Sequence, residues 1–153
     1  MANRSYSMDS NQQKEALASA KSSLEAAKVL YKPENNKGMS LIIPCAIDSA
    51  LSCELFLKVL INKSTGTFNS SHDIYVLFQA LDQSKKDSIE TAFNEKIDFT
   101  SFPDIPYNCL TDFLTAESNN FIEWRYPYEK TDLSFTITAW IALAEILQSE
   151  ADK

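Results

Sequence analysis

The chain contains one histidine, His72, which lies in the tripeptide Ser71-His72-Asp73 at the expected start of a helix. An imidazole at a helix start can act as a general base or contact a phosphate, because the helix amides add positive potential there. The alternative is that His72 caps or packs the helix and that Asp73 steers its ring. We favour this alternative, because a lone histidine has no second titratable partner in the sequence.

Glu54 and Lys58 are separated by four positions within the most apolar stretch of the chain. On a helix this spacing makes the two side chains neighbours, which predicts a local ion pair on a partly exposed strip, contributing about 0.3–0.5 kcal/mol. A second interpretation is that Glu54 is buried and pairs with Arg125, because a buried carboxylate needs a cation. We favour a structural pair over a functional one.

The segment 121–129, with the sequence FIEWRYPYE, is the most unusual in the chain, because four aromatic residues and two acids surround Arg125. Arginine among aromatic rings can stack on a nucleobase or bind a phosphate through two hydrogen bonds. Tyr126, Tyr128 and Glu129 are therefore candidate ligand contacts beside Arg125. The same composition suits a turn that fills one end of a helical bundle, with the tyrosine hydroxyls bonded to backbone. The structural interpretation is again favoured.

Helices must position these residues, and the longest apolar run, residues 40–62, predicts the central one. Its polar residues do not share one face of a helical wheel, which indicates a helix covered by neighbours on nearly every side. Ser40 is a candidate N-cap, Pro44 fits the opening turn, and the helix is expected to end near Asn62. Charges near its middle make a membrane span costly, so we expect no membrane contact.

Apolar residues at helical spacing predict further helices before and after this one. The first is expected to open with the capping box Ser10-x-x-Gln13, to present small alanines that permit close helix packing, and to end at Pro33. The later helices are expected over His72–Leu81 with Ser70 or Ser71 as cap, from Asp82 or Ser84, from about Tyr107 to before Pro127, and from Thr131 or Asp132.

Residues 1–8 are expected to form a flexible tail and residues 9–152 a single domain. Two glycines and five prolines supply too few turns for an all-β fold, and we expect no strands. Short connections favour antiparallel neighbours. The predicted fold is all-α, an up-and-down antiparallel bundle of four long helices plus one or two short helices.

The net charge of −7, from 21 acidic and 14 basic residues, argues against a broad basic face for coating DNA or RNA. A small local phosphate site is compatible with that charge. The three cysteines show no zinc spacing and are interpreted as buried thiols in a reducing cytosol. Glycine-rich phosphate loops and metalloenzyme motifs are missing, so we expect no metal and no cofactor. The polar N-terminus shows no signal peptide, which predicts a cytoplasmic protein.

The helix ALSCELFLKVLIN, the polar loop after it, and the later segments SHDIYVLFQAL and FIEWRYPYE together resemble the HEPN family of small all-α domains, found widely in bacteria. The resemblance extends from about the first helix to the last. It implies a helical bundle that often dimerises, so a homodimer is expected. Many members are metal-independent ribonucleases or toxins in toxin–antitoxin and phage-defence systems, and others are non-catalytic modules that bind nucleotides or RNA.

Catalytic members of that family use an arginine followed, after four to six residues, by a histidine. After Arg125 and after Arg4, the corresponding positions hold other residues: Lys130, Thr131 and Asp132, and Asp9, Ser10 and Asn11. Because the lone His72 lies upstream of Arg125, the motif cannot form locally. The resemblance therefore implies a non-catalytic domain that dimerises and binds a nucleotide, RNA or protein partner.

Two alternatives remain. The first is an atypical ribonuclease in which His72 and Arg125 converge in space, with His72 acting on the 2′-hydroxyl or leaving group and Arg125 stabilising phosphate charge. The second is a purely structural interaction bundle, in which losing Arg125 would leave Glu54 unpaired. The candidate ligand-binding residues common to these hypotheses are Glu54, Lys58, His72, Asp73, Arg125, Tyr126, Tyr128 and Glu129.

Overall fold

The computed structural model describes residues 4–32, 34, 41–118 and 133–153, and the side chains of residues 133–135 are outside that description. The described part is mostly helical, which confirms the all-α prediction. Its helices are α1 (Ser10–Tyr31), α2 (Ile42–Thr65), α3 (Ile74–Gln79), α4 (Gln83–Lys96), the 3₁₀ turn η2 (Phe99–Ser101), α5 (Leu110–Glu117) and α7 (Leu133–Ala151). Two short strands, β1 (Ser5–Tyr6) and β2 (Phe68–Asn69), complete it.

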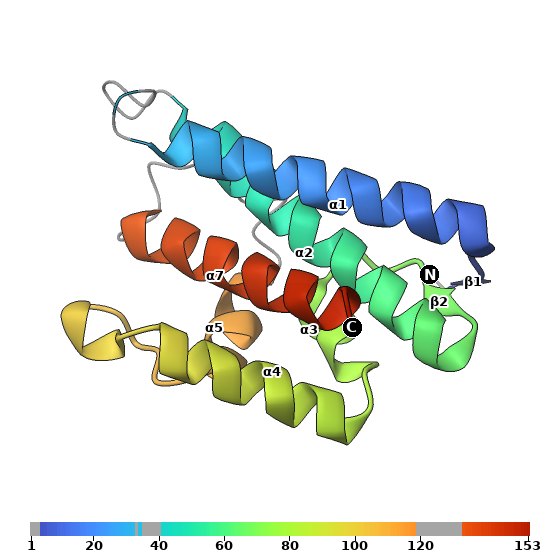
Figure 1. Cartoon of the computed structure of the whole chain (residues 1–153). Helices are drawn as coiled ribbons and strands as arrows, with labels where there is room; N and C mark the ends of the chain where they lie inside the picture. Colours follow the sequence, from blue (N-terminus) through green and yellow to red (C-terminus); the bar gives the residue numbers. More distant parts are fainter. Residues whose placement is uncertain (1–3, 33, 35–40, 119–132) are drawn as a thin grey trace.

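The long helices lie roughly along one direction, and α7 runs between the α1–α2 pair and α4 (Figure 1). In that view α1 runs from right to left, α2 returns from left to right, α4 runs leftward and α7 ends at the right. Helix α2 packs against α1, α7, α3 and β2, and most of its residues are buried. The expectation of a helix covered on most sides is therefore confirmed for α2.

Helix α1 begins at Ser10, one residue earlier than the predicted capping box implies, because its capping box uses different residues. Asp9 accepts a hydrogen bond from the Gln12 amide at 2.8 Å, and Gln12 returns one from the Asp9 amide at 2.9 Å. The Ser10–Gln13 box was wrong by one residue, because Asp9 provides the same N-cap chemistry one position earlier. Pro33, the predicted stop, lies outside the described residues, and the helix ends just before it at Tyr31.

Helix α2 extends one turn further than expected, to Thr65 instead of Asn62. Gly66 follows with a φ of 80°, the left-handed conformation that glycine adopts without steric cost, and its amide bonds to the Asn62 carbonyl. The polar residues after Asn62 were expected in a loop, but the glycine decides where the helix ends. Ser40, the predicted N-cap, lies outside the described residues.

The shorter helices also differ from expectation at their ends. Helix α3 covers Ile74–Gln79 and is capped by Asp73, not by Ser70 or Ser71. Helix α4 is capped by Asp82, one of the two residues predicted. Helix α5 begins at Leu110 instead of Tyr107. The predicted caps of α7, at residues 131 and 132, lie outside the described residues.

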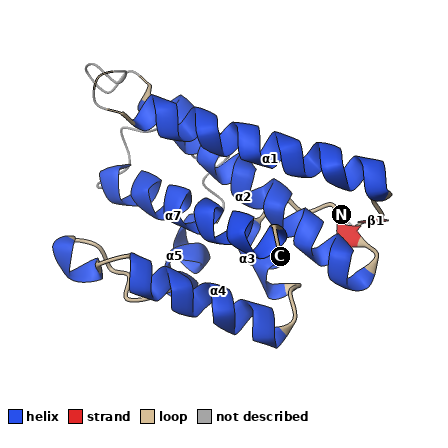
Figure 2. Ribbon diagram, in the orientation of Figure 1, coloured by secondary structure: helices blue, strands red, loops and turns tan. Residues whose placement is uncertain are grey.

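The N-terminal residues are not a free tail from residue 4 onward. Strand β1 pairs antiparallel with β2, with Ser5 opposite Asn69 and Tyr6 opposite Phe68 (Figure 2). The absence of strands was therefore predicted wrongly, although each strand is only two residues long. We call this pair the β1–β2 ribbon, and it joins segments more than sixty residues apart that carry no local strand pattern.

Small residues bring α1 and α2 close together, as the alanine stripe predicted. Ala20 and Ala27 are fully buried. Close approach allows the Ser52 hydroxyl to donate to the Ala20 carbonyl at 2.8 Å, and the Cys45 thiol to donate to the Ala27 carbonyl at 3.2 Å. These bonds satisfy polar groups that have no access to water.

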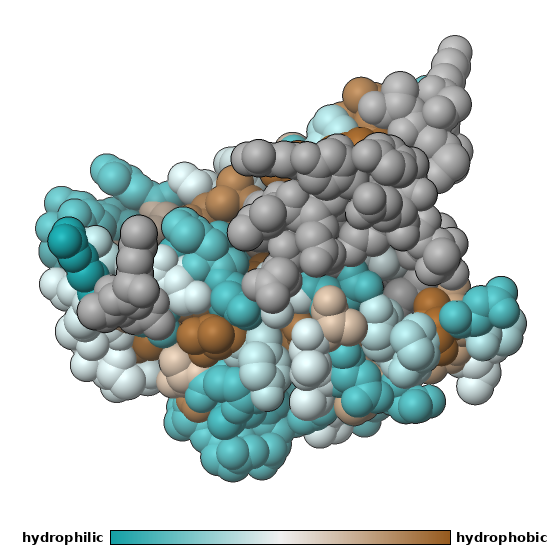
Figure 3. Space-filling model, turned by 180° about the vertical axis from the view of Figure 1, so that it is seen from behind, coloured by the Kyte–Doolittle hydropathy of each residue, from teal (hydrophilic) through white to brown (hydrophobic). Residues whose placement is uncertain are grey.

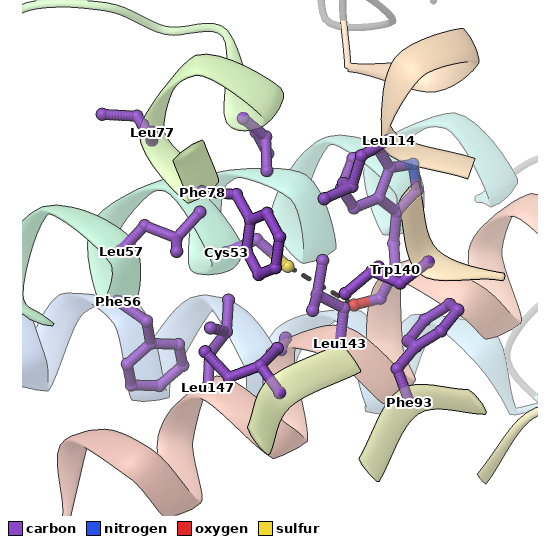
Figure 4. Packing of buried hydrophobic residues seen from close by; sticks show 14 of the residues in the cluster. Cys53, Phe56, Leu57, Leu77, Phe78, Phe93, Leu114, Trp140, Leu143 and Leu147 are labelled. Carbon is purple, nitrogen blue, oxygen red and sulfur yellow. Dashed lines mark hydrogen bonds between the residues drawn. The ribbon is translucent and has the colours of Figure 1, made fainter. Parts of the chain in front are cut away.

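The main core is formed where α2, α3, α4, α5 and α7 meet, and α1 adds Ala20 and Leu24 (Figure 4). Trp140 packs edge-on against Phe113 with ring centroids 4.8 Å apart, and Phe113 stacks on Phe93 at 5.9 Å. Each such buried side chain contributes roughly 1.5–3 kcal/mol through removal of apolar surface from water. The Cys53 thiol lies in the same cluster and donates to the Trp140 carbonyl at 3.5 Å. This core holds α2 and α7 in place.

Burial raises the pKa of the Cys45 thiol to about 11, and burial raises that of Cys53 further. Both are buried thiols, as expected, whereas Cys109 is partly exposed at the start of α5, which corrects the prediction for that residue. On the face seen in Figure 3, the described apolar surface is divided into small areas among hydrophilic ones. None of the described helices combines the length and apolar character that crossing a bilayer would require.

Candidate functional site

Glu54 and Lys58 form the predicted i, i+4 pair on α2, with 2.6 Å between Lys58 Nζ and Glu54 Oε1. The pair is buried, since Glu54 is 5% and Lys58 8% exposed, so it does not lie on an exposed strip. Removing two charges from water is costly, and the short contact offsets part of that cost. The carboxylate therefore has its cation supplied by its own helix.

His72 is the second partner of Glu54, with 2.8 Å between its Nδ1 and the same carboxylate oxygen. The imidazole side chain is 80% exposed, so it touches the buried carboxylate with one edge and faces water with the rest. Sequence spacing did not pair these two candidate residues, and the structure brings them into direct contact.

Side-chain hydrogen bonds to the backbone hold the segment that carries His72. Asn69 accepts from the Ser71 amide at 2.9 Å, and Ser71 accepts from the Asp73 amide at 3.0 Å. Asp73 in turn accepts from the Tyr75 and Val76 amides that open α3. Asp73 was a candidate ligand contact, but its Oδ1 is used as a helix cap. These bonds fix the backbone on both sides of the imidazole.

The contact with Glu54 determines the protonation pattern of the imidazole. An ionised carboxylate only accepts hydrogen bonds, so Nδ1 of His72 must carry the proton. In the neutral ring, Nε2 is then an acceptor that faces solvent, and in the protonated ring it is a second donor. A carboxylate that orients an imidazole in this way suits either proton transfer or recognition of an anion.

Asn62 and Phe68 complete the surroundings of the pair and were missed from the sequence. Asn62 lies one further turn along α2 from Lys58, and its amide group exchanges two hydrogen bonds with the Met8 backbone at 2.9 and 3.1 Å. Lys58 Nζ lies 5.9 Å from the centre of the Phe68 ring, within the range of a cation–π contact. Phe68 of the β1–β2 ribbon and Met8, two residues after β1, therefore cover a polar stripe of α2. In the sequence, the sign of this polar stripe was that Glu54, Lys58 and Asn62 recur at intervals of four residues.

The other candidates, Arg125, Tyr126, Tyr128 and Glu129, lie outside the described residues, and so does the predicted Glu54–Arg125 pair. Glu54 is nevertheless satisfied by Lys58 and His72. The Glu54–Arg125 pair stays a prediction, and Glu54 already has two partners without it.

A second charged cluster, unforeseen from the sequence, joins three helices around Glu145 of α7. Lys28 of α1 lies 3.2 Å from this carboxylate, and Lys96 of α4 makes a short contact with it. Partial burial acts to raise the pKa of Glu145, but the hydrogen bonds from Lys96 and Lys28 outweigh it and hold the pKa below its ordinary value. No local spacing connects these three residues, so sequence patterns could not reveal them.

Comparison with known proteins adds no relative. No protein-family model, no curated protein and no solved structure matches this chain. Among the described residues, no group of three or more potential ligands is placed to hold a metal ion. The HEPN resemblance stays a prediction, and the geometry around His72 is the basis for any functional proposal.

Proposed function

We propose that this chain is a HEPN-like, non-catalytic binding domain whose His72 contacts the phosphate of a nucleotide or RNA. One observation carries the proposal: a largely exposed imidazole is fixed at Nδ1 by a buried carboxylate 2.8 Å away. A ring held in one orientation loses little freedom when it binds a ligand, which favours affinity.

The charges around the ring support an anionic ligand. Glu54 and Lys58 carry opposite charges and lie 2.6 Å apart, so their fields largely cancel towards solvent. A protonated His72 then adds one positive charge with an N–H donor on the exposed side of the ring. Charge-assisted hydrogen bonds of this kind are the usual way in which side chains hold phosphate oxygens.

Titration of the labelled chain with AMP and with a short single-stranded RNA tests this proposal by NMR. We expect shifts at the amides of residues 69–75, and we expect His72→Ala to abolish them. Gln79→Ala, which changes an exposed residue of α3, is the matched control and should bind like the natural chain. The proposal fails if neither ligand moves these amides, or if His72→Ala binds equally well.

Dimerisation is a separate part of the proposal. The alternative is that a different protein binds the same exposed apolar residues. Its support is the exposure of two large apolar side chains, Val29 on α1 (48%) and Ile47 on α2 (40%). Sedimentation equilibrium over a wide range of concentrations should give twice the chain mass. Replacing Ile47 with Lys should shift the equilibrium to monomer, and a chain that is monomeric throughout removes this part.

An atypical metal-independent ribonuclease is the second candidate, because the Glu54–His72 contact also suits general-base catalysis. In this case the exposed Nε2 of His72 would remove the proton from a ribose 2′-hydroxyl. Purified chain and His72→Ala should then differ strongly in cleavage of a labelled RNA, with EDTA present to exclude contaminating metal-dependent nucleases. Equal background cleavage by the two proteins excludes the enzyme and leaves the binding domain.

A further inference from the structure

A groove of about 190 Å³ lies between the end of α1, the end of α4 and one face of α7. The residues that line it are Tyr31, Lys96, Ile97, Thr138, Ile141, Ala142 and Glu145. The four lining residues of α7, from Thr138 to Glu145, recur at helical spacing and so form one continuous strip. At a rise of 1.5 Å per residue, this strip is about 10 Å long. The groove is separate from the His72 segment in its lining residues.

The middle of the groove is apolar and its two ends are polar. Ile97 and Ala142 are almost fully buried, and Ile141 is partly buried beside them. At one end the Tyr31 and Thr138 hydroxyls share a hydrogen bond of 2.8 Å. At the other end lies the Glu145 cluster. A ligand that fits must therefore have an apolar body and at least one polar end.

The charged end of the groove favours an anion. Glu145 contacts two ammonium groups, those of Lys28 and Lys96, so the three side chains together carry one positive charge. Lys28 also approaches Glu25 at 3.6 Å, but that carboxylate is 70% exposed. Neither of these two residues lines the groove, where the charged side chains are Lys96 and Glu145. Partial burial acts to lower the pKa of Lys28, yet its contacts with Glu145 and Glu25 raise it above its ordinary value, which keeps this ammonium charged.

Lys96 is the residue placed to hold such an anion. Its side chain is 45% exposed and lines the groove. An ammonium has three N–H donors, and within the described part of the chain the only charged partner of Lys96 is Glu145. Donors remain that can bond to a second carboxylate without breaking the first contact.

We propose that this groove binds a small organic carboxylate with an apolar body, such as an aryl- or branched alkyl-acetate, with its carboxylate on Lys96. The size agrees, because a protein cavity of about 150 Å³ accepts a benzene ring, and this groove is somewhat larger. A cationic ligand would place its charge beside the Lys96 ammonium, so it should bind more weakly than an anion. The proposal does not depend on the function of His72.

Three probe ligands that share one ring test the charge requirement: phenylacetate, its neutral amide, and the cationic 2-phenylethylamine. NMR titration of the full chain should shift the amides of residues 96–97 and 138–145. We expect phenylacetate to bind at least about tenfold more tightly than the amide, because a charge-assisted hydrogen bond is lost. The amine should bind most weakly, and added salt should weaken phenylacetate binding.

Two variants in α4 distinguish binding in the groove from a general effect of removing one lysine charge. Lys96→Gln should weaken phenylacetate binding about tenfold and leave amide binding unchanged. Lys86→Gln makes the same chemical change near the other end of α4, where Lys86 contacts Gln79, and should bind like the natural chain. The proposal is overturned if no probe shifts these amides at millimolar concentration. Binding of the amine as tight as that of the acid, or equal loss in both variants, would also overturn it.

Discussion

Glu54 and Glu145 each contact two side chains that are cationic or can become so. Glu54 is buried, whereas Glu145 is partly exposed. The Glu54 side chain is 7% exposed, and its lysine comes from the next turn of the same helix. The Glu145 side chain is 31% exposed, and its lysines come from two other helices. We therefore expect the number of partners to be a poor guide to energy, because access to water decides what the loss of a partner costs.

Breaking the buried pair should have the largest effect. Lys58→Met leaves a buried carboxylate without its lysine and should lower the free energy of unfolding by about 3–5 kcal/mol. Urea titration followed by circular dichroism measures this change. The double variant Glu54→Leu, Lys58→Met removes both charges and should recover most of the loss. A loss below about 1 kcal/mol for Lys58→Met would show that water reaches Glu54 and would remove the distinction between the two sites.

Breaking the half-exposed cluster should matter less. Glu145→Gln removes two partly exposed ion pairs and should lower the free energy of unfolding by about 1 kcal/mol in low salt. Most of that difference should disappear at high ionic strength, where such pairs are screened. Glu25→Gln is the matched control, because its carboxylate is 70% exposed and 3.6 Å from Lys28, and it should change stability very little. A loss in Glu145→Gln as large as in Lys58→Met would contradict the comparison.

The contribution of Glu145 should also depend on pH in a defined direction. Its folded pKa lies below the ordinary value of 4.5, so the folded state holds this proton less tightly than the unfolded state. The stabilisation is therefore fully present above that ordinary value and is lost as the pH falls through the folded pKa. Urea midpoints of the natural chain and Glu145→Gln should differ near neutral pH and converge in acid. A difference that widens on acidification would mean that folding raises the pKa of Glu145 instead of lowering it.

The smallest effect on stability is expected at His72. His72→Ala leaves the Glu54–Lys58 pair in place and removes a side chain that is 80% exposed, so the free energy of unfolding should change by less than about 0.5 kcal/mol. Thermal and urea unfolding measure it. This variant can then be used as a clean test of binding. A much larger loss would mean that the imidazole is a structural partner of Glu54, as Lys58 is.

Local spacing predicted the parts of the molecule that depend on neighbours along the chain. Helical periodicity identified α1, α2, α4 and α7, and the spacing of four placed Glu54 beside Lys58. Helix ends were harder to predict because two neighbouring residues can each serve as the N-cap, as Asp9 and Ser10 can at the start of α1. The burial of Glu54 was one of two interpretations and could not be decided, because it depends on what covers α2.

Contacts between distant segments were beyond the reach of such patterns. Each strand of the β1–β2 ribbon is only two residues long, which is too short to show an alternation of polar and apolar residues. Asn62 could be placed near a helix end but not matched with the Met8 backbone, since any backbone segment offers the same donor and acceptor. The Glu145 cluster requires three helices to be docked before its members meet.

The ribbon has a practical consequence for anyone who purifies this chain. The Arg4 carbonyl accepts a hydrogen bond from the Ser70 amide at 3.0 Å, and Ser70 precedes His72 by two residues. An affinity tag fused ahead of Arg4 is therefore tethered next to the candidate site. Because a polyhistidine tag carries several imidazoles of its own, it would compete with His72 for any anion, and proteolytic removal of the tag should change the apparent affinity.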